Sequence, residues 1–261
     1  MILDEIVTAK KAELKRSKHE RRIEDLKAKA RNARPVPAFD LRQPGAVSII
    51  AEVKRASPVK GVFKPDLDAG KQALAYAEGG ARAISVLTDH AFFQGSVDDL
   101  RAARDASGLP ILRKDFIIDE YQLWEAKVMR ASAALLIVAI LDRPQLRDYI
   151  AFAREELKLA TLVEVHTERE LDRALDAGAT LLGINNRDLN TFQVTLETTA
   201  RLRAVVPPGV VTVSESGISK REDLLLLRQM KVDAALIGEE LVRAPDPAAK
   251  IRELLGASHA R

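Results

Sequence analysis

Several short apolar runs of this sequence end in charged or amide side chains, which a strand buried on both faces does not favour. The side chains are Glu52 with Lys54, Lys114, Glu164, Asn185 and Glu215. Burying one unpaired carboxylate or ammonium costs several kcal/mol. Folding alone therefore gives no reason to keep this set, whereas one polar pocket shared by several strand ends would explain all of it.

Two lysines with two or three carboxylates around an apolar floor can carry out acid–base chemistry. Desolvation lowers the pKa of a lysine, whereas neighbouring carboxylates raise it and hold the ammonium form. A protonated lysine can donate to a developing alkoxide, and a carboxylate can accept a proton in a later step. The alternative for any one of these side chains is a structural ion-pair network at the rim of a sheet.

Eight apolar runs position these side chains, and a loop and a helix-like segment follow each run. The runs are SIIAEV, AISVL, ILRK, ALLIV, TLVEV, LLGIN, VVTVS and AALIG. Continuous Val, Ile and Leu runs are typical of parallel strands buried on both faces. Eight strand–helix units predict an α/β protein with a single (β/α)8 TIM barrel, a fold that usually has about 250 residues.

A doubly wound open sheet is the rival fold. No G-x-G-x-x-G motif follows the first predicted strand, and no change in composition divides the chain into halves. The barrel is therefore favoured, and it brings the carboxyl ends of all strands to one mouth, where barrel enzymes have their active sites. This shared location favours an acid–base site over a structural rim network.

Residues 1–45 are predicted to form a helical extension and hinge that pack on the catalytic barrel of residues 46–261. Residues 1–34 contain eleven Lys and Arg against six Asp and Glu, and Pro35 and Pro37 end the helical pattern. Such a basic segment is either a solvated helix surface or a positive lid that attracts an anionic substrate.

Composition excludes several classes of protein. A net charge of +3 is too small to indicate nucleic-acid binding. The absence of cysteine excludes disulfides and thiolate metal sites, and no histidine pair has H-x-x-x-H spacing, so we expect no metal. No apolar run approaches the length of a membrane span, and the N-terminus is too charged for a signal peptide. We therefore expect a soluble cytoplasmic protein.

Two glycines follow the last two predicted strands, where barrels often bind phosphate. Gly217 and Gly238 precede helical segments, so their backbone can approach phosphate oxygens closely. Glu239 would repel phosphate unless its carboxylate turns away.

The cationic loop RASPVKGVFKPD follows the first predicted strand. It is either a mobile loop that closes over an anion or a solvated surface loop. Phe92 or Phe93 is placed either to stack on an aromatic substrate or to pack at the rim.

Seven ordered motifs resemble those of the indole-3-glycerol phosphate synthase family. They are IIAEVKRASP, SVLTD with FFQGS, LRKDFI, LVEVH, INNRDL, SESGI and LIGEELV, and the resemblance spans about residues 1–258. It implies a lyase of tryptophan biosynthesis that converts 1-(2-carboxyphenylamino)-1-deoxyribulose 5-phosphate to indole-3-glycerol phosphate, carbon dioxide and water. It also implies a small anionic substrate, no metal or organic cofactor, and a monomer or weak homodimer.

The resemblance assigns a role to each candidate residue. Lys114, in the K-D-F motif, is the expected general acid, Glu164 the expected base, and Glu52 assists dehydration or orients a lysine. Lys54 neutralises substrate charge, and Asn185 with Arg187 orients the substrate near its carboxylate. Phe93 and Phe116 are expected to flank the anthranilate ring. The other expected substrate contacts are Ser57, Arg187, Glu215 and Ser216, and the phosphate is expected near Gly217, Gly238 and Glu239.

The sequence departs from the family pattern at the substrate-facing rim. Val59 stands where Ser is common, Asp89 and His90 stand where Glu and Pro are common, and Glu239 stands where Ser is common.

Two other functions remain as alternatives. Phosphoribosylanthranilate isomerase expects a cysteine that this chain lacks, and a non-catalytic phosphosugar-binding barrel would not need so many titratable groups.

Overall fold

Eight parallel strands form a closed barrel in the computed structural model, which describes residues 2–188 and 191–256. Around the barrel the strands follow the order β1-β10-β9-β8-β7-β6-β5-β4. They are β1 Ser48–Val53, β4 Ala83–Leu87, β5 Ile111–Lys114, β6 Ala133–Ile137, β7 Ala160–Val165, β8 Leu181–Asn185, β9 Val211–Glu215 and β10 Ala234–Ile237. Each predicted apolar run forms a strand, and the predicted barrel is confirmed.

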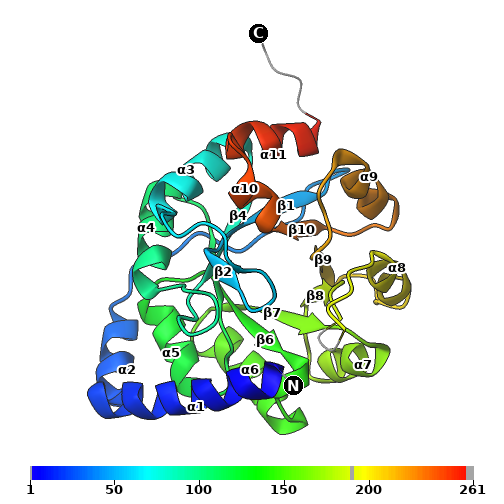
Figure 1. Cartoon of the computed structure of the whole chain (residues 1–261). Coiled ribbons are helices and arrows are strands. Elements are labelled where there is room, and N and C mark those ends of the chain that lie inside the picture. The colour runs from blue at the N-terminus through cyan, green and yellow to red at the C-terminus, as the bar shows by residue number, and fades with distance from the viewer. Residues whose placement is uncertain (1, 189–190, 257–261) are drawn as a thin grey trace.

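Helices follow the strands and surround the barrel (Figure 1). They are α3 Ala69–Gly79, α4 Val97–Ser107, α5 Glu120–Val128, α6 Arg143–Glu155, α7 Glu168–Asp176, α8 Glu197–Arg203, α9 Arg221–Gln229, α10 Glu239–Arg243 and α11 Pro247–Leu255, with a 3-10 turn, η1, at Val138–Ile140. None of the helices within the described residues has the length and apolar character needed to cross a membrane.

The N-terminal segment forms two helices instead of the single helical stretch expected over residues 1–34. These are α1 Ile2–Glu20 and α2 Ile23–Arg31. Tyr121 of α5 lies at the break, where its single hydroxyl proton is shared between the backbone oxygens of Ser17 at 3.0 Å and Arg21 at 2.9 Å. The Ser17 oxygen also accepts from the backbone N–H of Arg21 at 2.9 Å, so the chain is held at the point where α1 ends.

Both N-terminal helices lie along one side of the barrel, with α2 beside α5 (Figure 1). Leu14, Leu26 and Tyr121 form a buried apolar cluster there. This packing brings the first residues of α1 to the mouth of the barrel.

The loop after β1 contains a small hairpin that the sequence analysis did not predict. Its strands are β2 Ala56–Ser57 and β3 Gly61–Val62, and they pair in antiparallel orientation. In Figure 1 this loop lies over the centre of the barrel. The cationic loop is therefore partly structured.

The strands divide the apolar core into an inner part and outer parts. Inside the barrel, Ile50, Leu112, Leu162 and Val213 belong to one buried cluster. Outside, side chains of alternate strand positions such as Ile49 pack with the surrounding helices. The inner cluster forms the floor on which the candidate site is built.

Candidate active site

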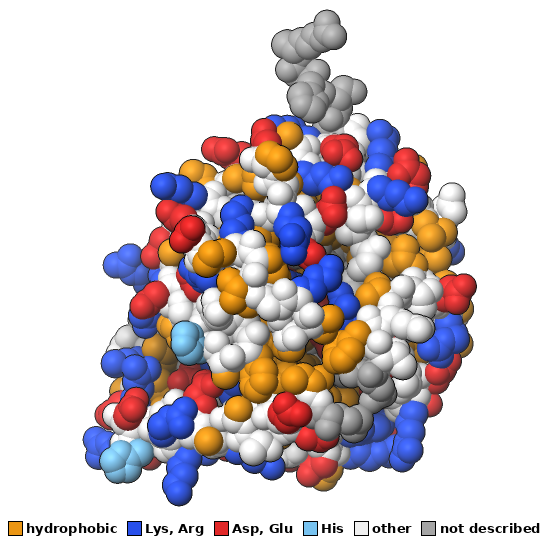
Figure 2. Space-filling view, viewed as in Figure 1, with side chains coloured by type: hydrophobic (Ala, Val, Ile, Leu, Met, Phe, Trp, Pro, Cys, Tyr) orange, Lys and Arg blue, Asp and Glu red, His pale blue; other side chains and the backbone are white. Residues whose placement is uncertain are grey.

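A cavity of about 540 Å³ opens at the carboxyl ends of the strands. Its lining includes every site residue expected from the sequence: Glu52, Lys54, Ser57, Phe93, Lys114, Phe116, Glu164, Asn185, Arg187, Glu215, Ser216, Gly217, Gly238 and Glu239. Ile2, Leu3 and Ile6 of α1 add an apolar wall. On the face seen in Figure 2, Lys and Arg side chains gather near the centre, next to hydrophobic ones.

The alternation of side chains along each strand explains why the polar groups face this cavity. Ile50 packs inside the barrel, so Glu52, two residues further on, projects from the same face of β1 at its open end. The same spacing relates Leu112 to Lys114, Leu162 to Glu164, and Val213 to Glu215. The floor and the polar rim therefore come from the same strands.

Lys114 lies between two carboxylates from other strands of the barrel. Its Nζ is 3.3 Å from Glu164 Oε2 and 3.5 Å from Glu215 Oε2. Burial alone would lower the pKa of Lys114, but the charges of Glu164, Glu215 and Glu52 outweigh burial and raise it. The lysine is therefore an ammonium ion at neutral pH and can act as a proton donor.

Glu215 and Glu164 are both buried, but their environments differ. Burial raises the pKa of Glu215, Lys114 opposes this, and the nearby Glu164 and Glu52 bring it to about 8. Glu215 Oε1 is buried and lacks a hydrogen-bond partner among the described residues. Burial also acts against ionised Glu164, but Lys114, His166 and a hydrogen bond from Asn185 lower its pKa overall. At neutral pH Glu164 is a carboxylate, whereas Glu215 is largely protonated.

A glycine in β8 makes room for Glu215. A Cβ at Gly183 would overlap Glu215 Oε1, and it would be 3.4 Å from a methyl group of Leu162. Any larger residue at this position would force the Glu215 carboxyl group to move away from its place beside Lys114.

Glu52 and Lys54 form a second ion pair at the mouth. Lys54 Nζ is 2.6 Å from Glu52 Oε2. A Cβ at Gly238 would overlap this Glu52 oxygen and would lie 3.1 Å from Lys54 Nζ. Gly238 thus leaves space for the ion pair, a reason for glycine in addition to the expected phosphate contact.

Asn185, Ser216 and Arg187 are linked at the ends of β8 and β9. Asn185 Oδ1 accepts hydrogen bonds from Ser216 Oγ at 3.0 Å and from the backbone N–H of Arg187 at 3.0 Å. Ser216 and Gly217 both have positive φ, 69° and 82°. For a serine this conformation is strained, and such strain is concentrated at functional sites.

The Glu239 carboxylate is held by two cations. Its Oε1 is 2.8 Å from Lys60 Nζ and 2.9 Å from Arg243 Nε. Burial acts against the charged form, but Lys60 and Arg243 lower the pKa of Glu239 overall. Lys60 also connects the loop after β1 to α10.

One aromatic pair lines the cavity. The rings of Phe93 and Phe116 have centroids 6.0 Å apart and are tilted by 35°. Phe92, the alternative stacking residue, does not line the cavity. Its backbone N–H instead donates to Asp89 Oδ1 at 2.8 Å.

Three features of the site were not identified from the sequence. His166 Nε2 is 3.5 Å from Glu164 Oε1, and its Nδ1 is 3.2 Å from Glu170 Oε2. The signal for His166 was its position two residues after Glu164, which places both on one face of the chain. The second feature missed from the sequence is Gly183, and the third is the apolar wall that α1 adds to the cavity. A glycine within an apolar strand was a signal for close approach of another group.

The described part of the chain has no group of three or more His, Cys, Asp or Glu side chains arranged to hold a metal ion. The carboxylates at the mouth are paired with lysines instead. What the arrangement offers chemically is an ammonium donor, an ionised carboxylate and a protonated carboxyl group around one apolar floor.

Comparisons with solved structures agree on the fold. A 3-hexulose-6-phosphate synthase matches with a TM-score of 0.64 at 14% identity, covering 80% of this chain and 99% of that one. Thiamine phosphate pyrophosphorylase from Pyrococcus furiosus matches with a TM-score of 0.59 at 17% identity, covering 80% and 94%. At such identities the likeness extends to the fold alone.

Sequence comparisons are more specific. The family model described as indole-3-glycerol phosphate synthase matches residues 3–254. The indole-3-glycerol phosphate synthase of Acetivibrio thermocellus is 48% identical over 257 residues, 97% of this chain and 98% of the relative. That of Dehalococcoides mccartyi strain BAV1 is 45% identical over 261 residues, 98% of this chain and 100% of the relative. The chain belongs to the indole-3-glycerol phosphate synthase family.

Proposed function

We propose that this chain closes the indole ring of 1-(2-carboxyphenylamino)-1-deoxyribulose 5-phosphate, yielding indole-3-glycerol phosphate, carbon dioxide and water in tryptophan biosynthesis. The observation that carries the proposal is the buried ammonium of Lys114 between Glu164 and Glu215, in a cavity of about 540 Å³. Membership of the family supports the same reaction.

Lys114 is the general acid of ring closure. The ring carbon that bears the carboxylate attacks the ketone carbon, and the ketone oxygen becomes an alkoxide. The ammonium of Lys114 donates a proton to this oxygen, which becomes a hydroxyl group. Because its pKa is raised, Lys114 holds its proton until strong negative charge develops on the oxygen.

The next steps need a base. Loss of carbon dioxide returns an electron pair to the ring and restores its aromaticity. The hydroxyl group takes up a proton and leaves as water while the adjacent CH2 carbon loses one, so a proton passes from that carbon to the leaving oxygen as the second double bond of the new ring forms. Glu164 is ionised at neutral pH and accepts that proton, and Glu52 assists the dehydration.

The remaining residues bind and orient the substrate. Phe93 and Phe116 flank the anthranilate ring, and Lys54 balances the charge of the substrate. Asn185 and Arg187 lie near the substrate carboxylate. The other contacts are Ser57 on the loop after β1 and, around the phosphate, Ser216, Gly217, Gly238 and the backbone of Glu239. Glu215 buttresses Lys114.

We also infer that the protein acts in the cytoplasm as a monomer or weak homodimer. Residues 1–45 serve as an extension of the barrel of residues 46–261. Sedimentation of the purified protein over a range of concentrations would test the oligomeric state.

Incubation of the purified protein with the carboxyphenylamino substrate tests the proposed reaction. The fluorescence of the indole product should rise, with one carbon dioxide released for each indole formed. The Lys114→Ala variant, checked for folding by circular dichroism, is the control for contaminating activity. Folded parent protein that forms no indole would overturn the proposal.

A further inference from the structure

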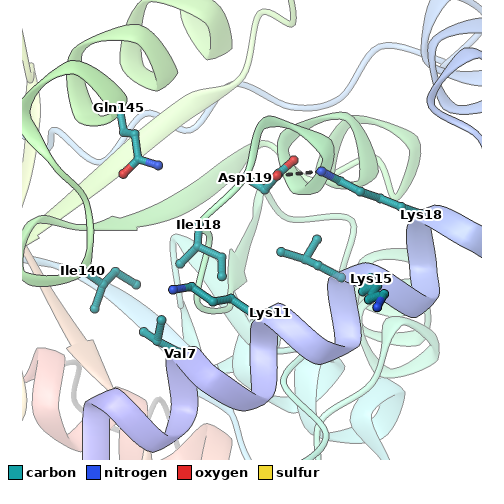
Figure 3. Close-up of a pocket in the computed structure, with 9 residues that line it drawn as sticks. Val7, Lys11, Lys15, Lys18, Ile118, Asp119, Ile140 and Gln145 are labelled. Atoms are coloured by element: carbon teal, nitrogen blue, oxygen red, sulfur yellow. Dashed lines mark hydrogen bonds and ion pairs between the residues drawn. The ribbon is translucent and has the colours of Figure 1, made fainter.

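Lys10 occupies an unusual place on α1. Together with Ile6 and Leu14 it forms the buried stripe of this helix, and its side chain is only 1% exposed. Its neighbour Lys11 is exposed and lines a separate groove between α1 and the segments of Ile118 and Ile140, as Figure 3 shows. A lysine at the centre of an apolar stripe must be paired, because an unpaired buried ammonium is costly.

The ammonium of Lys10 has three close carboxylate partners. Its Nζ is 2.9 Å from Asp115 Oδ1, 3.0 Å from Asp89 Oδ2 and 2.8 Å from Glu13 Oε2. An ammonium has three donors, so each can serve one carboxylate. Asp89 and Asp115 are themselves 1% exposed. Lys10 therefore bridges α1 to two points at the mouth of the barrel.

Each aspartate holds a segment that carries residues of the proposed site. Asp115 stands directly between Lys114 and Phe116, and its Oδ1 accepts a hydrogen bond from the backbone N–H of Phe116 at 2.8 Å. Asp89 Oδ1 accepts from the backbone N–H of Phe92, the residue before Phe93. The Lys10 ammonium thus connects the two segments that bear the aromatic pair and the lysine of the site.

We infer that Lys10 is a positioning residue, which fixes the segments carrying Lys114, Phe116 and Phe93 from the N-terminal helix. This inference rests on the proposed function of the cavity. Without the ammonium, Asp115 would keep Arg113 at 3.0 Å, but the buried carboxylate of Asp89 would keep no cation among the described residues and would carry an uncompensated charge near Asp115. Repulsion between the two carboxylates would separate the two segments, and a displacement of about 1 Å can lower a catalytic rate 10²-fold.

Steady-state kinetics of Lys10→Met provides the test, with Lys11→Met as the matched control on the same helix. We expect kcat/KM for indole formation to fall by about 10–10²-fold through both a lower kcat and a higher KM, while Lys11→Met keeps the parental values. A second variant, Lys10→Met with Asp89→Asn, restores the charge balance but not the bridge, and should remain impaired. Lys10→Arg, which keeps the charge, should recover much of the activity.

Crystal structures of the parent and of the double variant give a readout that does not depend on turnover. We expect Lys114 Nζ to move away from Glu164 and the Phe93–Phe116 pair to open. A folded double variant with unchanged positions of these side chains, or with kcat/KM within about threefold of the parent, would overturn the role of Lys10. A parent protein without activity would overturn the proposed function, while the crystal structures would still decide whether Lys10 positions these side chains.

Discussion

Two buried lysine–carboxylate clusters lie next to each other, one around the cavity and one between α1 and the barrel. The mouth cluster consists of Lys114, Glu164 and Glu215, and the helix cluster of Lys10, Asp89 and Asp115. Lys114 and Asp115 are consecutive residues, so one strand end serves both. The two clusters use similar side chains but satisfy them to different degrees.

In the helix cluster, both carboxylate oxygens of Asp115 are satisfied. Oδ1 meets Lys10, and Oδ2 accepts from Thr88 Oγ1 at 2.6 Å and from Arg113 at 3.0 Å. Burial would raise the pKa of Asp115, but Arg113 and Lys10 lower it to about 2. This carboxylate stays ionised across the physiological pH range and serves to hold the structure.

The mouth cluster leaves one carboxyl oxygen of the described residues without a partner. Glu215 Oε1 lacks a partner within the described part of the chain, and the pKa of Glu215 is raised to about 8. Neighbouring carboxyl groups whose pKa values are driven apart are typical of acid–base sites. Complete pairing therefore fixes an element in place, whereas incomplete pairing leaves a proton that can be exchanged.

The largest expected effect is that of Lys114→Met, which removes the donor from the mouth cluster. We expect kcat for indole formation to fall by about 10²–10⁴-fold, the usual contribution of a general acid. Stopped-flow fluorescence with saturating substrate measures this effect. If kcat fell no further in Lys114→Met than in Lys10→Met, the two clusters would not differ in their role in catalysis.

A smaller effect is expected for Gly183→Ala, which leaves every polar group of both clusters in the sequence. The new Cβ overlaps Glu215 Oε1, so the carboxyl group must turn away from Lys114. We expect kcat/KM to fall by about 10-fold or more and the free energy of unfolding to fall by about 1–3 kcal/mol from overpacking. Steady-state fluorescence assays and chemical denaturation measure the two effects.

Gly70→Ala is the matched control for this substitution. A Cβ at Gly70, in α3, has no neighbour closer than 3.4 Å. Alanine is also the better helix former. Equal losses of activity in the two variants would show that the place of Glu215 beside Lys114 does not matter.

The pH dependence of Glu215→Gln comes next in size. Above about pH 8 the parent loses the proton of Glu215, and the added negative charge holds the Lys114 ammonium more tightly, which makes it a weaker acid. We therefore expect kcat/KM of the parent to decline above about pH 8. The glutamine side chain of the variant cannot ionise, so this decline should vanish, with a change of less than about tenfold at pH 7. An unchanged pH profile would assign the decline to another group.

The smallest effect is expected for Lys18→Met on the exposed side of α1. Lys18 Nζ is 2.7 Å from Asp119 Oδ2 (Figure 3), but the side chain of Lys18 is 46% exposed. Exposed ion pairs contribute about 0.2–1 kcal/mol. Chemical denaturation should show a change in that range, with activity unaltered. A loss like that of Lys10→Met would mean that the whole helix face matters, and not the buried cluster.

The sequence predicted the barrel and the mouth cluster because both follow from periodicity. Apolar runs identified the strands, and the closed barrel brought Lys114, Glu164 and Glu215 together from positions far apart in the chain. The helix cluster was not predicted, since Lys10 was one of many lysines in a basic segment. Its partner Asp89 comes from a loop, and the packing of α1 on the barrel, which brings Lys10 to it, leaves no local signal in the sequence.

Nuclear magnetic resonance of the carboxyl carbons tests the contrast between the clusters most directly. With 13C-labelled Glu and Asp, the signals of Glu215, Glu164 and Asp115 can be followed between pH 5 and pH 10 at constant ionic strength, with assignments from single substitutions. We expect the Glu215 signal to titrate near pH 8, while those of Glu164 and Asp115 stay at their ionised positions throughout. A Glu215 signal that is already fully ionised at pH 5 would contradict this expectation.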